Sequence, residues 1–195
     1  RGPLFGRVYT AGAILPKDDS FDHELMRDSK KITSKVKIKE IAEYIKQNAI
    51  SWSITYETEQ TIDKINIRQS VLKSMHNSIK TVLDSVDFPS ARLLIDGNDF
   101  KPYIHFRSGE LEQCPHFTIE GGDNKYTPIA AASILAKVAR DEYIENLVAT
   151  NPDLEVKYGI GGNKGYGAKK HLEGIKQHGI TQWHRKTYGI CKQYV

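Results

Sequence analysis

The sequence is poor in cysteine and has no long apolar run. Its two cysteines, Cys114 and Cys191, stand at a separation that suits neither a metal site nor a redox pair, so we expect free thiols in a reducing compartment. No apolar stretch approaches the roughly 20 residues that span a bilayer, and no signal-peptide pattern opens the chain. These absences lead us to expect a cytoplasmic protein that has no membrane partner.

Internal repeats, low-complexity tracts and convincing linkers are absent as well. The 195 residues suffice for a core without covalent staples, and 39% hydrophobic and 27% charged residues are ordinary values for a globular protein. We expect a monomer with a single domain over residues 1–195, in which a Gly- and Lys-rich segment at 151–195 follows a core at 1–150. The formal net charge of +4 mildly favours a polyanionic partner.

The spacing of the apolar residues predicts an α/β protein. It predicts a mixed sheet flanked by helices, with a helical C-terminal segment. Residues 100–112 are expected to be irregular. The expected helices cover residues 34–47, 66–86, 128–149 and 168–178, and the expected strands cover residues 7–15, 50–57, 93–96 and 116–120.

The stretch ISWSITYE has the clearest strand pattern. Its larger side chains alternate with Ser51, Ser53 and Thr55. The alternation predicts that the face of the larger side chains is buried and that the other face is polar. The larger side chains are those of Ile50, Trp52, Ile54 and Tyr56.

Asp96 closes the apolar run at residues 93–95. Ligands of open α/β sheets gather beyond the carboxyl ends of the strands, so an acid at this position is well placed for a metal or a substrate. The alternative is that Asp96, Gly97 and Asn98 simply form a turn, since these residue types are common in turns.

Asp123 follows the strand at 116–120 through Gly121 and Gly122. The two glycines let the backbone bend sharply and approach another group. A helix N-terminus follows, where the helix dipole favours an ionised carboxylate. The alternative is a local cap or turn residue.

A third acid, Asp141, lies inside the helix expected at 128–149. It is ~20 Å along the helix axis from Pro128, so it would be far from strand ends at which that helix begins. Because it interrupts an apolar stripe, we interpret it as a structural acid with a buried partner.

Asp96 and Asp123 are therefore the candidate pair. Two carboxylates that converge at a sheet edge could bind Mg²⁺, which prefers hard oxygen ligands and keeps several waters. Without a cation, the two carboxylates would repel each other, and this repulsion would raise the pKa of one of them. Two acids are few for a two-metal site, so we expect further oxygen ligands.

Several longer motifs follow one another in the order found in ribonuclease HII, the type 2 ribonuclease H. They are RGPLFG, RDSKKIT, LLIDG, GGD followed by IAAASILAKVARD, NKGYG with His171, and WHRKTYG. The chain resembles this family from Arg1 to about Tyr188. The resemblance implies a ribonuclease H-like fold and an endoribonuclease that hydrolyses the RNA strand of RNA–DNA hybrids. It also implies cutting at single ribonucleotides in duplex DNA, as in ribonucleotide excision repair and DNA replication.

The resemblance implies a catalytic core at 1–150, a substrate-binding segment at 151–195 and a two-metal site for Mg²⁺ or Mn²⁺. The family has an Asp-Glu pair in a G-x-D-E-x-G-R-G stretch, an Asp in a strand-ending D-G and an Asp in a K-G-D or K-A-D motif. The last two map onto Asp96 and Asp123, and the products would be a 5′-phosphate and a 3′-hydroxyl. The Asp-Glu pair would precede Arg1 in an upstream segment, and glycine stands at position 121, where the family often has lysine.

Substrate-binding residues are implied as well. Arg1 and Gly2 match the part of G-R-G that contacts the ribonucleotide. Tyr166 matches the tyrosine that senses the 2′-hydroxyl, which is the local difference between RNA and DNA. Ser29 and Lys30 match the family's D-S-K segment and could contact phosphate. Without the resemblance, a loop aromatic and a solvated charge cluster would be the simpler interpretations.

Further basic residues surround the glycine loop and the tail. Such residues supply phosphate affinity that does not depend on sequence and weakens with salt. We interpret His171 and His184 as satisfied structural histidines, although both could bind phosphate. The basic residues are Lys164, Lys169, Lys170, Arg185 and Lys186.

Two other functions stay open. A nuclease of related fold, such as a junction resolvase or an integrase core, would be indifferent to a 2′-hydroxyl. A non-catalytic hybrid-binding or accessory subunit of the same fold would have an upstream sequence without the Asp-Glu pair.

Overall fold

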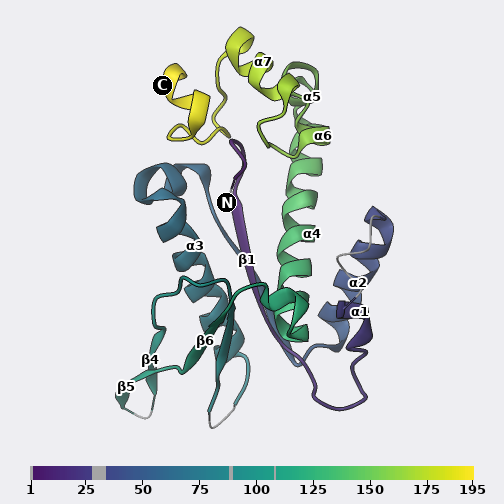
Figure 1. The fold of residues 1–195 in the computed structure, drawn as a ribbon, viewed down its shortest axis with the longest axis vertical. Coiled ribbons are helices and arrows are strands. Elements are labelled where there is room, and N and C mark those ends of the chain that lie inside the picture. The colour runs from purple at the N-terminus through teal and green to yellow at the C-terminus, as the bar shows by residue number, and fades with distance from the viewer. Residues whose placement is uncertain (1, 28–33, 88–89, 108) are drawn as a thin grey trace. The chain divides into compact units, whose positions relative to one another are not determined.

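The computed structural model describes residues 2–27, 34–87, 90–107 and 109–195 (Figure 1). The described residues contain both helices and paired strands, which confirms the predicted α/β class. Among the described residues, no helix is both long and apolar enough to cross a membrane. The elements are, in order, β1 (Val8–Ile14), α1 (Glu24–Arg27), α2 (Lys35–Asn48), β2 (Ser51–Glu57), α3 (Glu59–Asp84), β3 (Leu93–Asp96), β4 (Ile104–Arg107), β5 (Glu110–Gln113), β6 (His116–Ile119), the 3-10 turn η2 (Gly122–Asn124), α4 (Thr127–Thr150), α5 (Asp153–Tyr158), α6 (Ile160–Asn163), α7 (Lys169–His178) and the 3-10 helix η3 (Gly189–Tyr194).

The strands form pairs of mixed direction. β1 pairs with β2. β3 pairs with β6 in parallel, and β4 pairs with β5 in antiparallel orientation. Parallel strands that are far apart in sequence need a connection that leaves the pair and returns, and here the β4–β5 hairpin lies within that connection.

Three predicted helices are confirmed as α2, α4 and α7. Ser34 caps α2, since its side chain accepts a hydrogen bond from the N–H of Lys37. The C-terminal segment is helical, as predicted, and it also contains α5 and α6, which the apolar spacing did not reveal. In Figure 1 these short helices lie together with α7.

The long helix α3 begins earlier than predicted. Asn66 has φ 65° and ψ 165°, so it separates two helical segments. Its side-chain oxygen accepts from the N–H of Gln69 over 3.1 Å, which makes Asn66 the cap of the second segment. The predicted start near residue 66 is thus the start of that second segment, and the first segment was missed.

The prediction of irregular chain over residues 100–112 is wrong. β4 and β5 form a hairpin in which Phe106 lies opposite Leu111. These two side chains are 71% and 75% exposed. Each of these strands has only four residues and β5 is wholly exposed, so the alternation in the sequence is too short to reveal the pair.

The prediction of which face of β2 is buried is also wrong. Ser51 and Ser53 are buried, while Trp52 and Tyr56 are 37% and 45% exposed. The Ser53 hydroxyl donates to the carbonyl of Ser78 on α3 over 2.9 Å. Small hydroxyl side chains let the helix approach the strand closely, and their hydrogen bonds offset the cost of burying them.

The chain divides into two compact units. One unit contains residues 1–9, 56–73 and 139–195, and the other contains residues 10–55 and 74–138. Each has its own apolar core, one with the buried residues Phe5, Ile144 and Ile175, the other with Ala131 and Leu135 of α4. The expectation of a single domain over residues 1–195 stays a prediction.

Candidate active site

Asp96 is held at the carboxyl end of the parallel strand pair. It lies opposite Ile119, and the ladder continues because the N–H of Gly97 donates to the carbonyl of Ile119 over 2.9 Å. Both strands therefore end at one edge, which is where open α/β sheets bind their ligands. The Asp96 side chain is exposed there.

The turn after β6 brings the chain back to this edge. Gly121 has φ 61°, in the left-handed region that favours glycine, and η2 follows it. The N–H of Gly122 donates to Oδ1 of Asp96 over 2.9 Å. The structure therefore places Asp96 against the residue that directly precedes Asp123.

Gly122 has no room for a side chain. A Cβ at this position would lie 2.6 Å from Cδ1 of Ile129 and 3.3 Å from Oδ1 of Asp96. The first distance is shorter than real Cβ contacts allow, so a larger residue would displace one of its neighbours. Glycine thus permits the close approach of the peptide N–H to the carboxylate.

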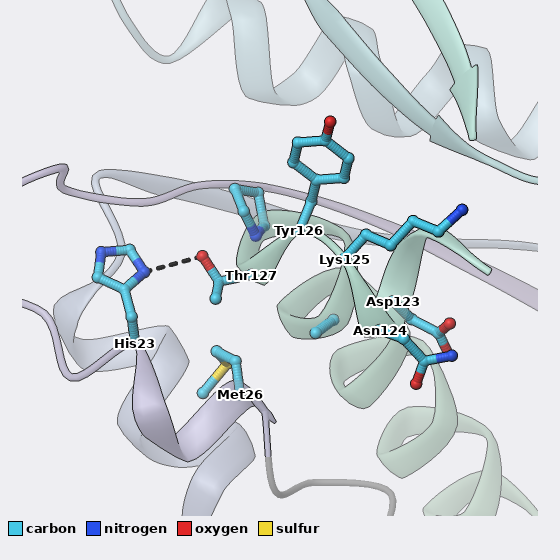
Figure 2. Close-up of a pocket in the computed structure, with 9 residues that line it drawn as sticks. His23, Met26, Asp123, Asn124, Lys125, Tyr126 and Thr127 are labelled. Atoms are coloured by element: carbon cyan, nitrogen blue, oxygen red, sulfur yellow. Dashed lines mark hydrogen bonds between the residues drawn. The ribbon is translucent and has the colours of Figure 1, made fainter. Parts of the chain in front are cut away.

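A cavity of about 260 Å³ opens beside this turn (Figure 2). On one side of it stands His23, whose two ring nitrogens are hydrogen-bonded to the Thr127 hydroxyl over 2.8 Å and to the Pro16 carbonyl over 2.9 Å. The side chains of Asp123 and Asn124 point away from His23 in Figure 2. The Asp123 carboxylate is therefore not directed at this histidine.

The two acids suit a hard divalent cation. Carboxylate oxygens are the ligands that Mg²⁺ and Mn²⁺ prefer. The N–H of Gly122 bonds only Oδ1 of Asp96, which leaves Oδ2 to bind a cation. Over the ranges that the structure describes, no three His, Cys, Asp or Glu side chains are grouped closely enough to hold a metal. Asp96 and Asp123 therefore fit as part of a coordination shell that water, substrate phosphate or further acids complete.

Gly2 and Tyr166, which were matched to substrate binding, lie close together in the unit that contains residues 1–9, 56–73 and 139–195. A Cβ built on Gly2 would lie 3.7 Å from Cε1 of Tyr166. The N–H of Leu4 donates to the carbonyl of Gly165 over 2.9 Å, which ties the N-terminal segment to the GYG loop. The Tyr166 side chain is 54% exposed, so a ligand can reach it.

Lys164 already has a partner. Its ammonium lies 3.3 Å from Oε1 of Glu145, and its carbonyl accepts from Nη2 of Arg140 over 2.8 Å. Its backbone has φ 52°, so the loop is tightly turned at this point. A phosphate would therefore compete with Glu145 for the Lys164 ammonium.

Several sequence interpretations have no structural counterpart. Arg1, Ser29 and Lys30 lie outside the described residues, so their substrate contacts stay predictions. Asp141 is half-buried in α4 and belongs to the unit that does not contain Asp96 and Asp123. Its interpretation as a structural acid also stays a prediction.

Arg185 is a structural residue, which corrects the prediction that it supplies phosphate affinity. Its side chain is 1% exposed. Its Nε donates to the carbonyl of Gly6 over 2.9 Å, and its Nη2 donates to that of Arg7 over 3.2 Å. A guanidinium presents several fixed donors, so it can hold two successive carbonyls of the segment just before β1. Nothing in the local sequence distinguishes such an arginine from an exposed one.

Arg140 has a similar role that the sequence did not reveal. Its Nη2 donates to the carbonyl of Phe5 over 3.3 Å as well as to that of Lys164. Burial lowers the pKa of this guanidinium. The N-terminal segment and the glycine loop are thus joined by a side chain of α4. The one available signal was a basic residue that interrupts the apolar stripe of that helix.

The interpretation of His171 and His184 as satisfied structural histidines is confirmed. Their side chains are 0% and 1% exposed. Their Nε2 atoms are 3.1 Å apart, and each Nδ1 has a further hydrogen-bond partner. Burial lowers the pKa of both imidazoles, and that of His184 falls to about 3.

Comparison with known proteins gives a family and close relatives. A family model described as Ribonuclease HII matches residues 1–191. A protein named Ribonuclease HII from Phocaeicola vulgatus is 40% identical over 190 residues, which cover 97% of this chain and 85% of the relative. A protein of the same name from Parabacteroides distasonis is 41% identical over 193 residues, which cover 99% and 87%.

Two solved structures are similar in fold. The crystal structure of the ribonuclease H2 from Pyrococcus horikoshii OT3 has a TM-score of 0.74 at 20% identity, covering 100% of this chain and 92% of that one. The structure of the PCNA:RNase HII complex from Archaeoglobus fulgidus has a TM-score of 0.71 at 22% identity, covering 96% and 90%. At such identities the likeness concerns the fold, and it confirms the ribonuclease H-like α/β architecture.

Proposed function

Because this chain belongs to the ribonuclease HII family, we propose that Asp96 and Asp123 are metal ligands of its catalytic centre. The protein is an endoribonuclease that hydrolyses phosphodiester bonds in the RNA strand of RNA–DNA hybrids. Its activity depends on a divalent metal. The observation that carries the assignment is the bond from the N–H of Gly122 to Asp96, which gathers the two acids at one edge of a strand pair.

The cations are Mg²⁺ or Mn²⁺. Asp96 and Asp123 would hold such ions, which would supply activation of a water and charge stabilisation at the leaving 3′ oxygen, so the products would carry a 5′-phosphate and a 3′-hydroxyl. Asp96 contributes its exposed carboxylate, and the backbone N–H of Gly122 fixes the orientation of that carboxylate. Asp123 contributes the second carboxylate from a turn that its glycines shape.

The substrates include duplex DNA that carries a single ribonucleotide. Gly2 and Tyr166 are in contact, and the exposed Tyr166 ring can pack beside a sugar. A 2′-hydroxyl at this place distinguishes RNA from DNA. Arg1, Ser29 and Lys30 contact the ribonucleotide or its phosphates in this proposal, and Lys164 contributes a weaker phosphate contact because Glu145 shares its ammonium.

The cellular role that follows is ribonucleotide excision repair and the removal of RNA during DNA replication. We place the protein in the cytoplasm as a monomer. Its two free cysteines are both buried, which suits a reducing compartment.

The substitution Asp96→Asn tests the catalytic assignment. The substrate is a DNA duplex with one ribonucleotide, with Mg²⁺ or Mn²⁺, and an all-DNA duplex serves as the substrate control. We expect cleavage at the ribonucleotide to fall by at least about 100-fold, since even the loss of a group that only orients a metal ligand costs 10–100-fold. Binding of the duplex should stay within a few-fold, because phosphate contacts dominate affinity.

The matched control is Asp19→Asn, which removes an exposed carboxylate of the loop after β1. It should cut at the unsubstituted rate. The assay uses both the 195-residue chain and a version that includes whatever its gene encodes before Arg1. Metal-dependent cleavage that survives Asp96→Asn overturns the assignment of Asp96. If neither version cuts but both bind hybrids, the protein is a non-catalytic hybrid-binding protein.

A further inference from the structure

The pair of buried histidines connects three segments of one unit. His171 lies on α7, and His184 lies in the tail beyond it. His184 forms a β-bridge with Phe5, and the Phe5 ring packs edge-on against the His184 ring at a centroid distance of 5.0 Å. Tyr158 covers the same ring at 5.2 Å. The two imidazoles are therefore shielded from water by aromatic side chains, and neither takes part in the metal chemistry proposed above.

The partners of the pair determine where its protons are. The N–H of Thr181 donates to Nδ1 of His184 over 2.9 Å, so Nδ1 is unprotonated and the proton of the neutral ring is on Nε2. The carbonyl of Tyr166 can only accept, and it lies 2.8 Å from Nδ1 of His171, which must therefore carry a proton. Nε2 of His171 is then an acceptor for the Nε2–H of His184, 3.1 Å away.

The result is one directed series of hydrogen bonds that ends on the GYG loop. It runs from the N–H of Thr181 through His184 and His171 to the carbonyl of Tyr166. That carbonyl also accepts from the N–H of Ala168 over 2.8 Å, so the peptide after Tyr166 is held by two donors. Both rings are neutral because burial lowers their pKa values.

The peptide before Tyr166 is held just as closely. The N–H of Tyr166 donates to the carbonyl of Asn163 over 3.0 Å, and the N–H of Gly165 donates to Oδ1 of Asn163 over 2.8 Å. Gly165 has φ 82°, and a Cβ there would lie 3.0 Å from the Phe5 carbonyl oxygen. Hydrogen bonds thus hold the backbone on either side of Tyr166, while the Tyr166 ring itself is exposed.

We infer that His171 and His184 are positioning residues, which present the Tyr166 ring against Gly2 before the substrate arrives and so set the discrimination between ribose and deoxyribose. The inference rests on the proposed function, because it assigns the ribonucleotide contact to Tyr166. A positioning role is chemically reasonable, since a misplacement of about 1 Å in a reacting complex can cost 100-fold in rate. The pair acts on both sides of this contact, on Tyr166 through its carbonyl and on the segment of Gly2 through Phe5.

Two substitutions at one position separate positioning from packing. His171→Asn keeps an N–H donor close to where Nδ1 stands, whereas His171→Leu fills a similar volume without any donor. We expect His171→Leu to lower kcat for cleavage at a single ribonucleotide by roughly 10- to 100-fold. KM should change by less than about threefold, because the phosphate contacts that dominate affinity are untouched. His171→Asn should restore most of the loss in kcat.

The same substitution in a Tyr166→Ala background decides whether His171 acts through Tyr166. If it does, His171→Leu has little further effect once the ring is gone, as expected for two residues that act as a unit. Equal losses in both backgrounds would overturn the inference. Ile175→Ala, in the core next to the pair, is the packing control and should lower thermal stability while keeping kcat at a temperature at which it is folded.

Amide hydrogen exchange supplies a readout that needs no substrate. The N–H groups of Leu4 and Ala168 bond the carbonyls of Gly165 and Tyr166, so their exchange reports the order of the loop. We expect faster exchange at both in His171→Leu and near-unsubstituted exchange in His171→Asn. Unchanged exchange in both variants would overturn the inference. If the loop loosens as expected while the unsubstituted protein fails to cut at ribonucleotides, the histidines still order the Tyr166 loop, but their role in discriminating ribose falls together with the proposed function.

Discussion

At the residue scale, the geometry of the candidate metal site depends on a residue that has no side chain. Asp96 and Asp123 were predictable as a pair because each follows a short apolar strand. The bond between Gly122 and Asp96 was not, because it joins residues 26 apart whose meeting depends on the parallel register of β3 and β6. Gly121, at the position where lysine was the family expectation, adopts the left-handed conformation without the steric cost that a side chain would add.

The buried histidines lead to a prediction at this same scale. His184 has a pKa of about 3 in the folded protein, chiefly because of burial and then because of His171, while an unfolded histidine titrates near pH 6.5. The folded state therefore holds this ring neutral where the unfolded state is protonated. The stability contribution of the neutral ring is complete above about pH 6.5 and is lost as the pH falls from there toward 3.

Urea unfolding at a series of pH values measures this effect. The free energy of unfolding should fall by up to about 1.4 kcal/mol per pH unit from His184, in addition to the losses from other groups. His184→Gln keeps an N–H donor but cannot titrate, so its free energy of unfolding should fall less steeply below about pH 6.5. Parallel curves for the two proteins would show that His184 does not titrate between the two states.

At the element scale, α7 packs on α5 at a distance that only glycine allows. A Cβ on Gly174 would lie 2.2 Å from the backbone carbonyl oxygen of Lys157 and 2.9 Å from Cδ1 of Tyr158. Backbone atoms cannot move aside as the end of a side chain can. The sequence predicted α7 from its amphipathic pattern, but not α5 or this contact, since six residues carry too little periodicity to reveal a helix.

The substitution Gly174→Ala should therefore lower the free energy of unfolding by about 1–3 kcal/mol, as overpacking of a core does, despite the better helix propensity of alanine. Gly162→Ala is the matched control, because a Cβ at Gly162 would meet no atom within 4 Å. That variant should be neutral or gain up to about 1 kcal/mol. Chemical denaturation compares the two, and equal stabilities would contradict the close contact between α5 and α7.

At the scale of the whole molecule, the net charge of +4 was the first sign of a polyanionic substrate. The composition does not indicate which basic residues contact the phosphates of such a substrate. Arg185 is buried, and the ammonium of Lys164 lies 3.3 Å from Glu145 with its side chain only 16% exposed. Lys169 and Lys170 pair with Glu173 and Glu155 at a longer 3.9 Å, and their side chains are 90% and 56% exposed. These two lysines are the better candidates for contacts with the phosphates of a duplex.

Replacing Lys169 and Lys170 by glutamine should weaken binding to an RNA–DNA hybrid. Each phosphate contact contributes about −0.9 to the slope of log K against log salt, so the slope should become shallower by about 2. Fluorescence anisotropy in the Asp96→Asn background measures this binding without cleavage. Lys80→Gln with Lys101→Gln removes the same charge from other exposed positions, and an equal change of slope in that control would exclude a specific role for the pair.

The sequence by itself determined the α/β class, the helices α2, α4 and α7, the family and the two candidate metal ligands. These properties depend on local periodicity, capping residues and contiguous motifs, which a linear chain displays. The tertiary structure alone decided which face of β2 is buried, that β4 and β5 pair with each other, and that Arg140 and Arg185 hold backbone carbonyls. It also decided that His184 is hydrogen-bonded to His171, and that His171 is hydrogen-bonded to the carbonyl of Tyr166. The physical reason is that burial and hydrogen-bond partners are set by elements distant in sequence, so a serine or an arginine is inside or outside according to what packs against it.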